Sequence, residues 1–154
     1  MILFIISIAW FIFIVHFLWH IAKIYFTREI LDPRTSQNLL QPPLITVIIP
    51  ARNEESNIEK CVLSLLSQTY PSEKLEIIIV DDNSSDNTAS IVKRIMNEHE
   101  NLTLLSAGIL PKGWGGKNHA CWQGTKRAEG NWYCFIDADT QSAPELLVPK
   151  TGKF

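Results

Sequence analysis

Hydrophobic and polar positions alternate in blocks over residues 44–147, and each block has the length and period of one secondary-structure element. Continuous apolar runs, rich in β-branched residues, predict strands at residues 44–50, 75–80, 102–107 and 132–138. Apolar residues at helical spacing predict helices at residues 58–66, 91–96 and 117–128. Strands that are apolar on both faces and are separated by helices favour a parallel sheet covered on both sides, which is an α/β fold.

The last predicted helix carries small residues on one ridge. Ala120, Gly124 and Ala128 lie four residues apart and therefore share one helix face. A glycine inside a helix costs about 1 kcal/mol relative to alanine, so its presence here indicates close packing or contact on that face.

A separate apolar block precedes this alternation. Residues 2–22 are almost entirely apolar, and a helix of that length rises roughly 30 Å, enough to cross a bilayer core. Basic residues follow the block at Lys23, Arg28 and Arg34, and none precedes it, which predicts a cytoplasmic location for the downstream chain. No small-x-small cleavage site follows, which argues against a signal peptide. We therefore predict a single-pass membrane anchor at 1–26, a Pro-containing linker at 27–43 and a domain at 44–154.

Composition, net charge and cysteine spacing exclude few classes of function. The hydrophobic fraction of 46% reflects mainly the first block, and the net charge of −2 gives no reason to expect a nucleic-acid partner. The cysteines, Cys61, Cys121 and Cys134, have no Cys-x-x-Cys spacing and lie among apolar neighbours. We interpret them as reduced core residues.

Polar clusters follow three of the four predicted strands, at residues 50–55, 81–86 and 137–139. In an open parallel sheet the carboxyl ends of the strands share one edge, and ligands bind beyond that edge. The clusters are therefore expected to converge on one site. This coincidence is the strongest indication of function that the residues themselves provide.

Each cluster suggests a chemistry. Asp81 and Asp82 leave a buried strand, and a carboxylate there can accept hydrogen bonds from a nucleoside base or ribose. The nearby Ser85, Asp86 and Thr88 are interpreted as turn and cap residues. In an extended backbone Asp137 and Asp139 point the same way, and a few hard oxygen ligands suit Mg²⁺ or Mn²⁺ bridged to a diphosphate.

A glycine-rich segment lies between the second and third clusters. Gly113, Gly115 and Gly116 would let the backbone pass close to a ligand just before Lys117. The segment lacks the spacing of a phosphate-binding P-loop, because Asn118 follows Lys117 where that motif has Ser or Thr. The basic pair at positions 126 and 127 could meet phosphate charge or could form a solvated helix face, and the sequence leaves both open.

With these motifs in order, the chain resembles a known family. Residues 47–88, from VIIPARNEES to DDNSSDNT, resemble the opening of family 2 glycosyltransferases, which have the GT-A fold, and FIDADT resembles their Asp-x-Asp motif. GWGGKNHACWQG is similar to a segment of the membrane-anchored branch that includes hopanoid-associated and carotenoid glycosyltransferases. The predicted sheet would then be the Rossmann-like, nucleotide-binding half of a GT-A fold.

The resemblance also implies roles for residues. By it, the residues that bind the nucleotide-sugar would be Pro50, Arg52, Glu54, Asp82 or Asp81, Lys117 and Asp137. Asp137 and Asp139 would hold the metal, Mg²⁺ or Mn²⁺, with Asp139 the more direct ligand. The implied reaction is inverting transfer of a sugar from a nucleotide-sugar donor to a lipid or lipid-like acceptor at the cytoplasmic membrane face.

The chain departs from the family pattern after the third cluster. The family's general base lies well beyond the Asp-x-Asp motif, and Glu145 is the one acidic residue that follows Asp139 here. We interpret the end of the sequence as that of a truncated or frame-shifted product, with the base expected beyond residue 154. The rival hypothesis is a non-catalytic fragment that binds a nucleotide-sugar. A nucleotidyltransferase is disfavoured because PARNEES lacks the glycines that such a loop requires.

Overall fold

The computed structural model describes residue 10, residues 13–19 and residues 42–148 of the chain. The chain divides into two compact units, residues 1–38 and 39–154. In the first unit the described residues are helical, and the rings of Phe13 and Phe17 stack with their centroids 6.3 Å apart. No helix in the described part of the chain is both long and apolar enough to cross a bilayer. Most of the predicted anchor and linker lies outside the described residues.

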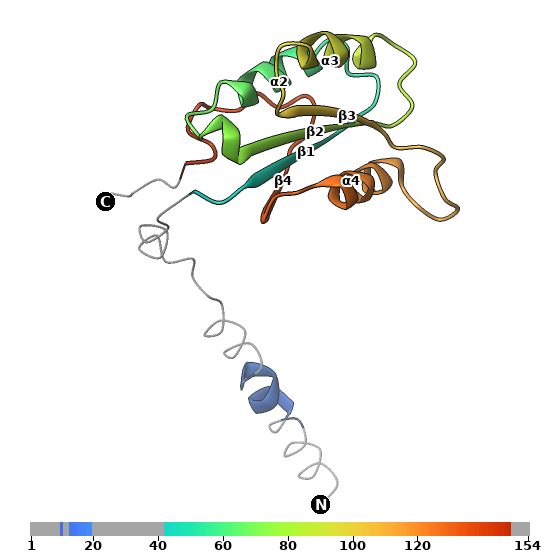
Figure 1. Cartoon of the computed structure of the whole chain (residues 1–154). Coiled ribbons are helices and arrows are strands. Elements are labelled where there is room, and N and C mark those ends of the chain that lie inside the picture. Colours follow the sequence, from blue (N-terminus) through green and yellow to red (C-terminus); the bar gives the residue numbers. More distant parts are fainter. Residues whose placement is uncertain (1–9, 11–12, 20–41, 149–154) are drawn as a thin grey trace, which may run out of the picture. The chain divides into compact units, whose positions relative to one another are not determined.

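The second unit contains a four-stranded parallel sheet with strand order β3-β2-β1-β4 (Figure 1). Its strands are β1 (Ile45–Ala51), β2 (Leu75–Asp81), β3 (Leu102–Ser106) and β4 (Trp132–Phe135). Its helices are α2 (Ile58–Leu66), α3 (Thr88–Met96) and α4 (Gly116–Arg127), with a short 3₁₀ helix η2 (Ser72–Lys74) that was not predicted. The parallel α/β fold predicted from the apolar pattern is therefore confirmed.

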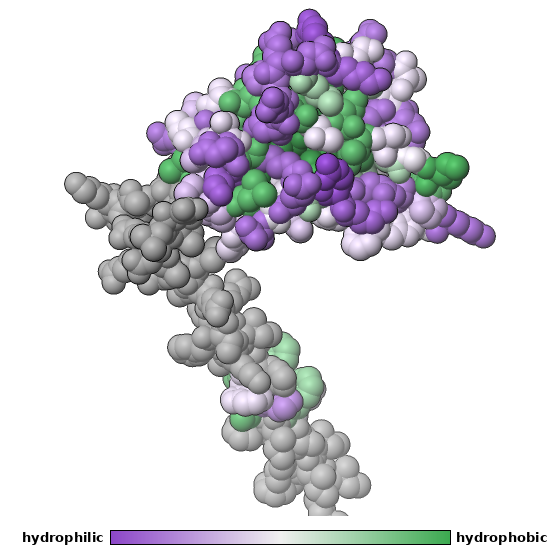
Figure 2. Space-filling view, in the orientation of Figure 1, coloured by the Kyte–Doolittle hydropathy of each residue, from purple (hydrophilic) through white to green (hydrophobic). Residues whose placement is uncertain are grey.

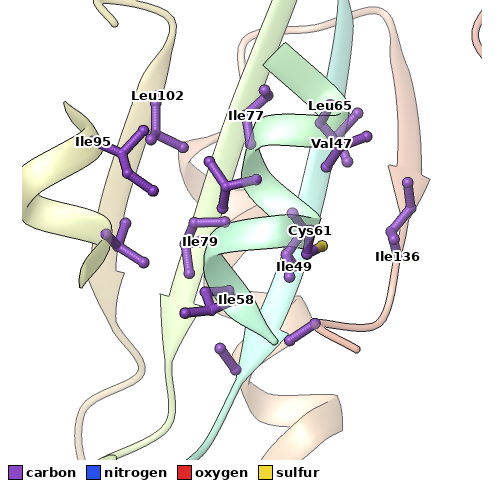
Figure 3. Packing of buried hydrophobic residues seen from close by; sticks show 14 of the residues in the cluster. Val47, Ile49, Ile58, Cys61, Leu65, Ile77, Ile79, Ile95, Leu102 and Ile136 are labelled. Atoms are coloured by element: carbon purple, nitrogen blue, oxygen red, sulfur yellow. The ribbon is translucent and has the colours of Figure 1, made fainter. Parts of the chain in front are cut away.

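The two faces of the sheet are covered differently. Helices α2 and α3 pack on one face and α4 packs on the other (Figure 1). Because side chains alternate along a strand, Val47 and Ile49 of β1 point toward α2, whereas Ile48 points toward α4. Figure 3 shows the larger core, in which side chains of α2 lie over β1 and β2, and Ile95 of α3 lies beside Leu102 of β3.

The core explains why the strands read as continuous apolar runs. Residues 77–80 of β2 are all completely buried, as are residues 47–49 of β1, because helices cover both sides of these central strands. Strand β4 differs: it pairs only with β1 among the described residues, and its Trp132, Tyr133 and Phe135 are about half exposed. Its regular pairing ends at Phe135, earlier than predicted, and the following Ile136 and Ala138 pack in the core on the α2 side of the sheet.

Helix α4 approaches the sheet closely at Gly124, as the small-residue ridge predicts. A Cβ at this position would lie 2.5 Å from Cγ2 of the buried Ile48 and 3.2 Å from Cγ2 of Val80. Ala120, one turn earlier on the same ridge, is completely buried against the same face. The glycine thus sets the distance between helix and sheet.

We expect Gly124→Ala to lower the free energy of unfolding by about 1–2 kcal/mol, because overpacking in the core outweighs the gain in helix propensity. Urea denaturation of the full chain in detergent micelles, followed by circular dichroism, would measure this. Asn118→Ala, an exposed position in the same helix, is the matched control and should leave the unfolding curve nearly unchanged. Equal stability of Gly124→Ala and the parent would contradict the close-packing account.

Candidate functional site

The candidate site is a pocket of about 370 Å³ at the carboxyl ends of β1 and β4. The strand order reverses between these two strands, since β2 and β3 lie on one side of β1 and β4 on the other. Such a reversal leaves a crevice between the loops that leave the two strands, and ligands in open α/β sheets bind there. The volume lies in the range of small-molecule and cofactor sites.

The structure brings together all but one of the site residues predicted from the sequence. The pocket is lined by Pro50, Arg52, Glu54, Asp82, Lys117, Asp137 and Asp139. These residues come from the end of β1, three separate loops and the start of α4, so their convergence follows from the parallel sheet rather than from local sequence. The exception is Asp81, whose side chain does not line the pocket.

The two adjacent aspartates have different positions. The Asp81 carboxylate accepts a hydrogen bond from the backbone N–H of Ser84 at 3.3 Å and supports the turn after β2. Asp82 is 6% exposed, and its Oδ2 lies 3.6 Å from Nη1 of Arg52. Its backbone N–H donates to the carbonyl of Ala51 at 2.8 Å, which ties it to the end of β1. Of the alternatives left open by the sequence, Asp82 is the one that faces the pocket.

Two interlocked loops hold the rim next to Asp82. Asn53 and Asn83 each lie two residues beyond the paired ends of β1 and β2, and both have positive φ, 56° and 57°. The Asn53 Oδ1 accepts the backbone N–H of Ser85 at 2.8 Å, and the backbone N–H of Glu54 donates to Oγ1 of the buried Thr88 at 2.8 Å. These bonds fix the backbone that carries Glu54 into the pocket.

This role of Asn53 and Thr88 was not predicted from the sequence. The available signal was an asparagine at the same distance after two successive strands, because asparagine tolerates positive φ better than most residues. Asp86 is a turn residue rather than the helix cap, because the N-cap of α3 is Asn87. The Asp86 Oδ1 accepts the backbone N–H of Thr88 at 3.0 Å, while its Oδ2 accepts the N–H of Glu55 at 3.0 Å.

Asp137 and Asp139 have different partners in the pocket. Nζ of Lys117 lies 2.6 Å from Oδ1 of Asp137, and this hydrogen-bonded partner raises the pKa of the Lys117 ammonium. Asp139 is exposed and forms no hydrogen bond or ion pair with any described residue. Of these two aspartates, Asp137 is paired with a cation, whereas the carboxylate of Asp139 is exposed to solvent.

This donor set fits a divalent cation that is only partly coordinated by protein. Mg²⁺ and Mn²⁺ accept carboxylate oxygens together with water and phosphate oxygens, so one or two aspartates suffice. Within residues 10, 13–19 and 42–148, no cluster of three or more His, Cys, Asp or Glu forms an all-protein metal cage. Asp139 is the described residue best placed to hold such an ion, with Asp137 beside it.

The buried Cys61 lies close enough to the pocket for the pocket's carboxylates to affect the pKa of its thiol. Cys61 of α2 is buried, and its Sγ lies 3.7 Å from the backbone carbonyl of Asp137. Burial, and after it the charges of Asp139 and Glu54, raise the pKa of the Cys61 thiol to about 11. All three cysteines are free, but Cys121 and Cys134 are half-buried rather than fully in the core, because α4 and β4 lie at the margin of the fold.

Helix α4 contributes to the pocket only through its first turn. A Cβ at Gly116 would collide with the Asp82 carboxylate, so this glycine permits the close approach that the sequence predicts for the glycine-rich segment. The basic residues at the other end of α4 do not line the pocket, and Nη1 of Arg127 pairs with Oε1 of Glu129 at 2.7 Å. The structure therefore places Lys126 and Arg127 away from the site.

Gly116→Ala should displace the Asp82 side chain without weakening the fold, since alanine favours the helix by about 1 kcal/mol. We expect nucleotide affinity to fall while the urea midpoint stays within error of the parent. Gly115→Ala is the control, because a Cβ there meets only the side-chain nitrogen of Asn118 at 4.0 Å. Unchanged affinity in Gly116→Ala would mean that the Asp82 position does not matter for binding.

A family model described as glycosyl transferase family 2 matches residues 46–151. The chain is 33% identical over 124 residues to a probable glycosyltransferase, YdaM, of Bacillus subtilis, covering 80% of this chain and 29% of that protein. It is 33% identical to beta-monoglucosyldiacylglycerol synthase of Trichormus variabilis, covering 75% of this chain and 25% of that protein. It is 38% identical to 4,4'-diaponeurosporenoate glycosyltransferase of Staphylococcus haemolyticus, covering 63% of this chain and 24% of that protein. The chain thus spans about a quarter of the length of these curated relatives.

Solved structures agree with the sequence matches. Mannosyltransferase PcManGT of Pyrobaculum calidifontis, in complex with GDP-Man and Mn²⁺, has a TM-score of 0.61 at 32% identity and covers 75% of this chain and 36% of its own. TarS of S. aureus, residues 1–349 in complex with UDP-GlcNAc, has a TM-score of 0.57 at 33% identity, and the match covers 67% of this chain and 28% of the TarS chain. The parallel sheet and these similarities lead to one conclusion: this chain belongs to glycosyltransferase family 2 and has a Rossmann-like α/β sheet of the GT-A type.

Proposed function

We propose that this chain binds a nucleotide-sugar, with Mg²⁺ or Mn²⁺, and serves as the donor-binding part of an inverting glycosyltransferase. The observation that carries the proposal is the pocket at the β1/β4 reversal, which gathers Arg52, Asp82, Lys117, Asp137 and Asp139. A buried carboxylate, two cations and a solvent-facing carboxylate match the parts of a nucleoside diphosphate and its metal.

In this proposal each residue has a defined task. The Asp82 carboxylate accepts hydrogen bonds from the base or ribose. The backbone of Gly116 packs against this carboxylate, and the guanidinium of Arg52 pairs with it. Lys117, paired with Asp137, places a positive charge at the diphosphate. A divalent ion at Asp139 would supply Lewis-acid stabilisation of the departing diphosphate. A carboxylate outside the described residues deprotonates the acceptor hydroxyl.

We further propose a lipid or lipid-like acceptor and a location at the cytoplasmic face of a membrane. Two of the relatives support the acceptor class, since their names specify a diacylglycerol glycolipid product and a carotenoid acid. The apolar block at residues 2–22, followed by Lys23, Arg28 and Arg34, supports the membrane location. Protease accessibility of residues 42–148 in right-side-out and inverted vesicles would test the orientation.

A radiolabelled donor assay tests the proposed reaction. The full chain in lipid vesicles is incubated with UDP- or GDP-sugars and Mn²⁺, and the lipid phase is extracted and counted. Label in the lipid phase that disappears in Asp139→Ala would support transfer. Donor binding without any label transfer would favour the second candidate, a non-catalytic nucleotide-sugar-binding fragment.

A further inference from the structure

The loop between β3 and α4 presents hydrophobic side chains to solvent on a surface that is not part of the pocket. Ile109 is 94% exposed, and Leu110, Trp114 and Trp122 are each between 43% and 53% exposed. The rings of Trp114 and Trp122 lie with centroids 6.4 Å apart, so the loop and the outer face of α4 form one continuous surface. Figure 2 shows a hydrophobic projection, bordered by hydrophilic atoms, where Figure 1 places this loop.

The backbone holds the loop tip away from the fold. Gly108 and Gly113 have φ of 73° and 87°, a region that residues with a Cβ rarely adopt, and open space surrounds both. The chain changes direction at Gly108 and Gly113, so residues 109–112 between them project from the fold. The side-chain amide of Asn83 donates to the carbonyl of Gly108 at 3.2 Å and anchors the base of the loop. The exposure of Ile109 is therefore a built feature of the backbone.

Residues 107–128, which contain the loop and α4, carry a positive net charge, whereas the rest of the globular unit is acidic. Residues 107–128 contain four basic side chains and no carboxylate, whereas the rest of residues 42–148 contains five basic and fourteen acidic side chains. Lys117 and Arg127 are already paired with carboxylates. Lys112 and Lys126 form no ion pair with any described residue, and Lys126 lies one turn from Trp122 on the same face of α4.

We propose that this surface, made of Ile109, Leu110, Lys112, Trp114, Trp122 and Lys126, docks on an anionic lipid bilayer. The proposal rests on the membrane location given under Proposed function and adds a second, independent contact from the globular unit. Tryptophan and aliphatic side chains enter the headgroup boundary, while lysines remain with the anionic headgroups. The unpaired lysines favour an anionic bilayer over a protein partner, because we would expect a surface that binds a protein to lack such a surplus of unpaired cations.

Docking at this surface has a consequence for the pocket. The loop runs directly into Gly116 and Lys117, which line the pocket. A bilayer that contacts Trp114 therefore lies beside the pocket rim, and a hydroxyl at the headgroup level reaches the donor without leaving the membrane. The surface would thus select acceptors that reside in the bilayer.

Quenching of tryptophan emission by brominated lipids tests the proposal. The full chain is reconstituted into phosphatidylcholine vesicles with and without phosphatidylglycerol, and single Trp→Phe variants assign the emission of each residue. We expect Trp114 and Trp122 to be quenched in vesicles that contain phosphatidylglycerol. Trp132, which is more exposed than either but lies on β4, is the control and should not be quenched.

Lysine variants test the charge contribution without changing any tryptophan. Lys112→Gln and Lys126→Gln should each lower docking about fivefold on anionic vesicles, seen as a smaller quenched fraction for Trp114 and Trp122. Neither change should affect the unfolding curve, because both side chains are exposed. An identical quenched fraction in both variants and the parent would remove the electrostatic part of the proposal and overturn it as stated.

The outcomes separate this surface from the membrane anchor. Quenching of Trp10 and Trp19 without Trp114 and Trp122 would overturn the docking surface and leave the proposed membrane location standing. Quenching of none of the tryptophans would overturn both. A blue shift of Trp114 emission that grows with protein concentration in lipid-free micelles would assign the surface to a second copy of the chain and overturn lipid docking.

Discussion

Replacing Asp139 with alanine is expected to remove metal-dependent nucleotide binding, with a loss of affinity for UDP or GDP of at least 10- to 100-fold in the presence of Mn²⁺. The reason is that Asp139 is the pocket carboxylate without a partner among the described residues, whereas Asp137 is engaged by Lys117 at 2.6 Å. Electron paramagnetic resonance of Mn²⁺ measures this directly, because the free ion's signal diminishes when the ion binds protein and nucleotide.

Two comparisons make the Asp139 result specific. Glu145→Ala removes the next carboxylate along the chain, which does not line the pocket, and should leave Mn²⁺ binding unchanged. Chelation of the metal should reduce nucleotide affinity of the parent but have little further effect on Asp139→Ala. Full metal-dependent binding by Asp139→Ala would show that the ion is held elsewhere.

Replacing Asp82 with asparagine should weaken nucleotide binding about 10-fold or more, corresponding to the ~1.5–3 kcal/mol of a hydrogen bond to a charged group. The change keeps the size of a side chain that is packed against Gly116, so the loss would come from charge and acceptor capacity rather than from a cavity. Isothermal titration of UDP and GDP into the full chain in micelles gives the dissociation constants.

The adjacent residue provides the matched control. Asp81→Asn makes the same chemical change one position away, on a side chain that supports the turn through Ser84 and does not line the pocket. We expect its nucleotide affinity to stay within about twofold of the parent, since an amide oxygen can still accept this hydrogen bond. If Asp81→Asn lost binding and Asp82→Asn kept it, the assignment of the two aspartates would have to be reversed.

Most of the fold was predictable because its signals are local and mutually consistent. Residues 77–79 are three isoleucines buried on both faces, and only a central strand of a covered parallel sheet has such a run. Gly124 predicted close helix packing because a glycine within a helix is otherwise unfavourable, and Cγ2 of Ile48 lies 2.5 Å from the point where a Cβ would stand at this position. The end of β4 was predicted less well, because WYCFIDA remains apolar beyond Phe135 while regular pairing with β1 stops there.

The composition of the site was predictable from strand ends, but its internal geometry was not. Parallel topology places Arg52, Asp82 and Asp139 at one edge of the sheet, which the sequence pattern indicates. The choice between Asp81 and Asp82 depends on the twist of the chain after β2, and the pairing of Lys117 with Asp137 depends on how α4 returns to the sheet. Those are tertiary facts that no local pattern contains.

We infer that the pocket at the β1/β4 reversal binds a nucleotide-sugar together with a divalent cation. Calorimetric titration of UDP- and GDP-sugars into the full chain, with and without Mn²⁺, tests it most directly. We predict saturable binding of at least one donor that strengthens with Mn²⁺ and weakens in both Asp82→Asn and Asp139→Ala. Absence of metal-dependent binding by a folded parent chain, or binding that both variants retain in full, would contradict the claim.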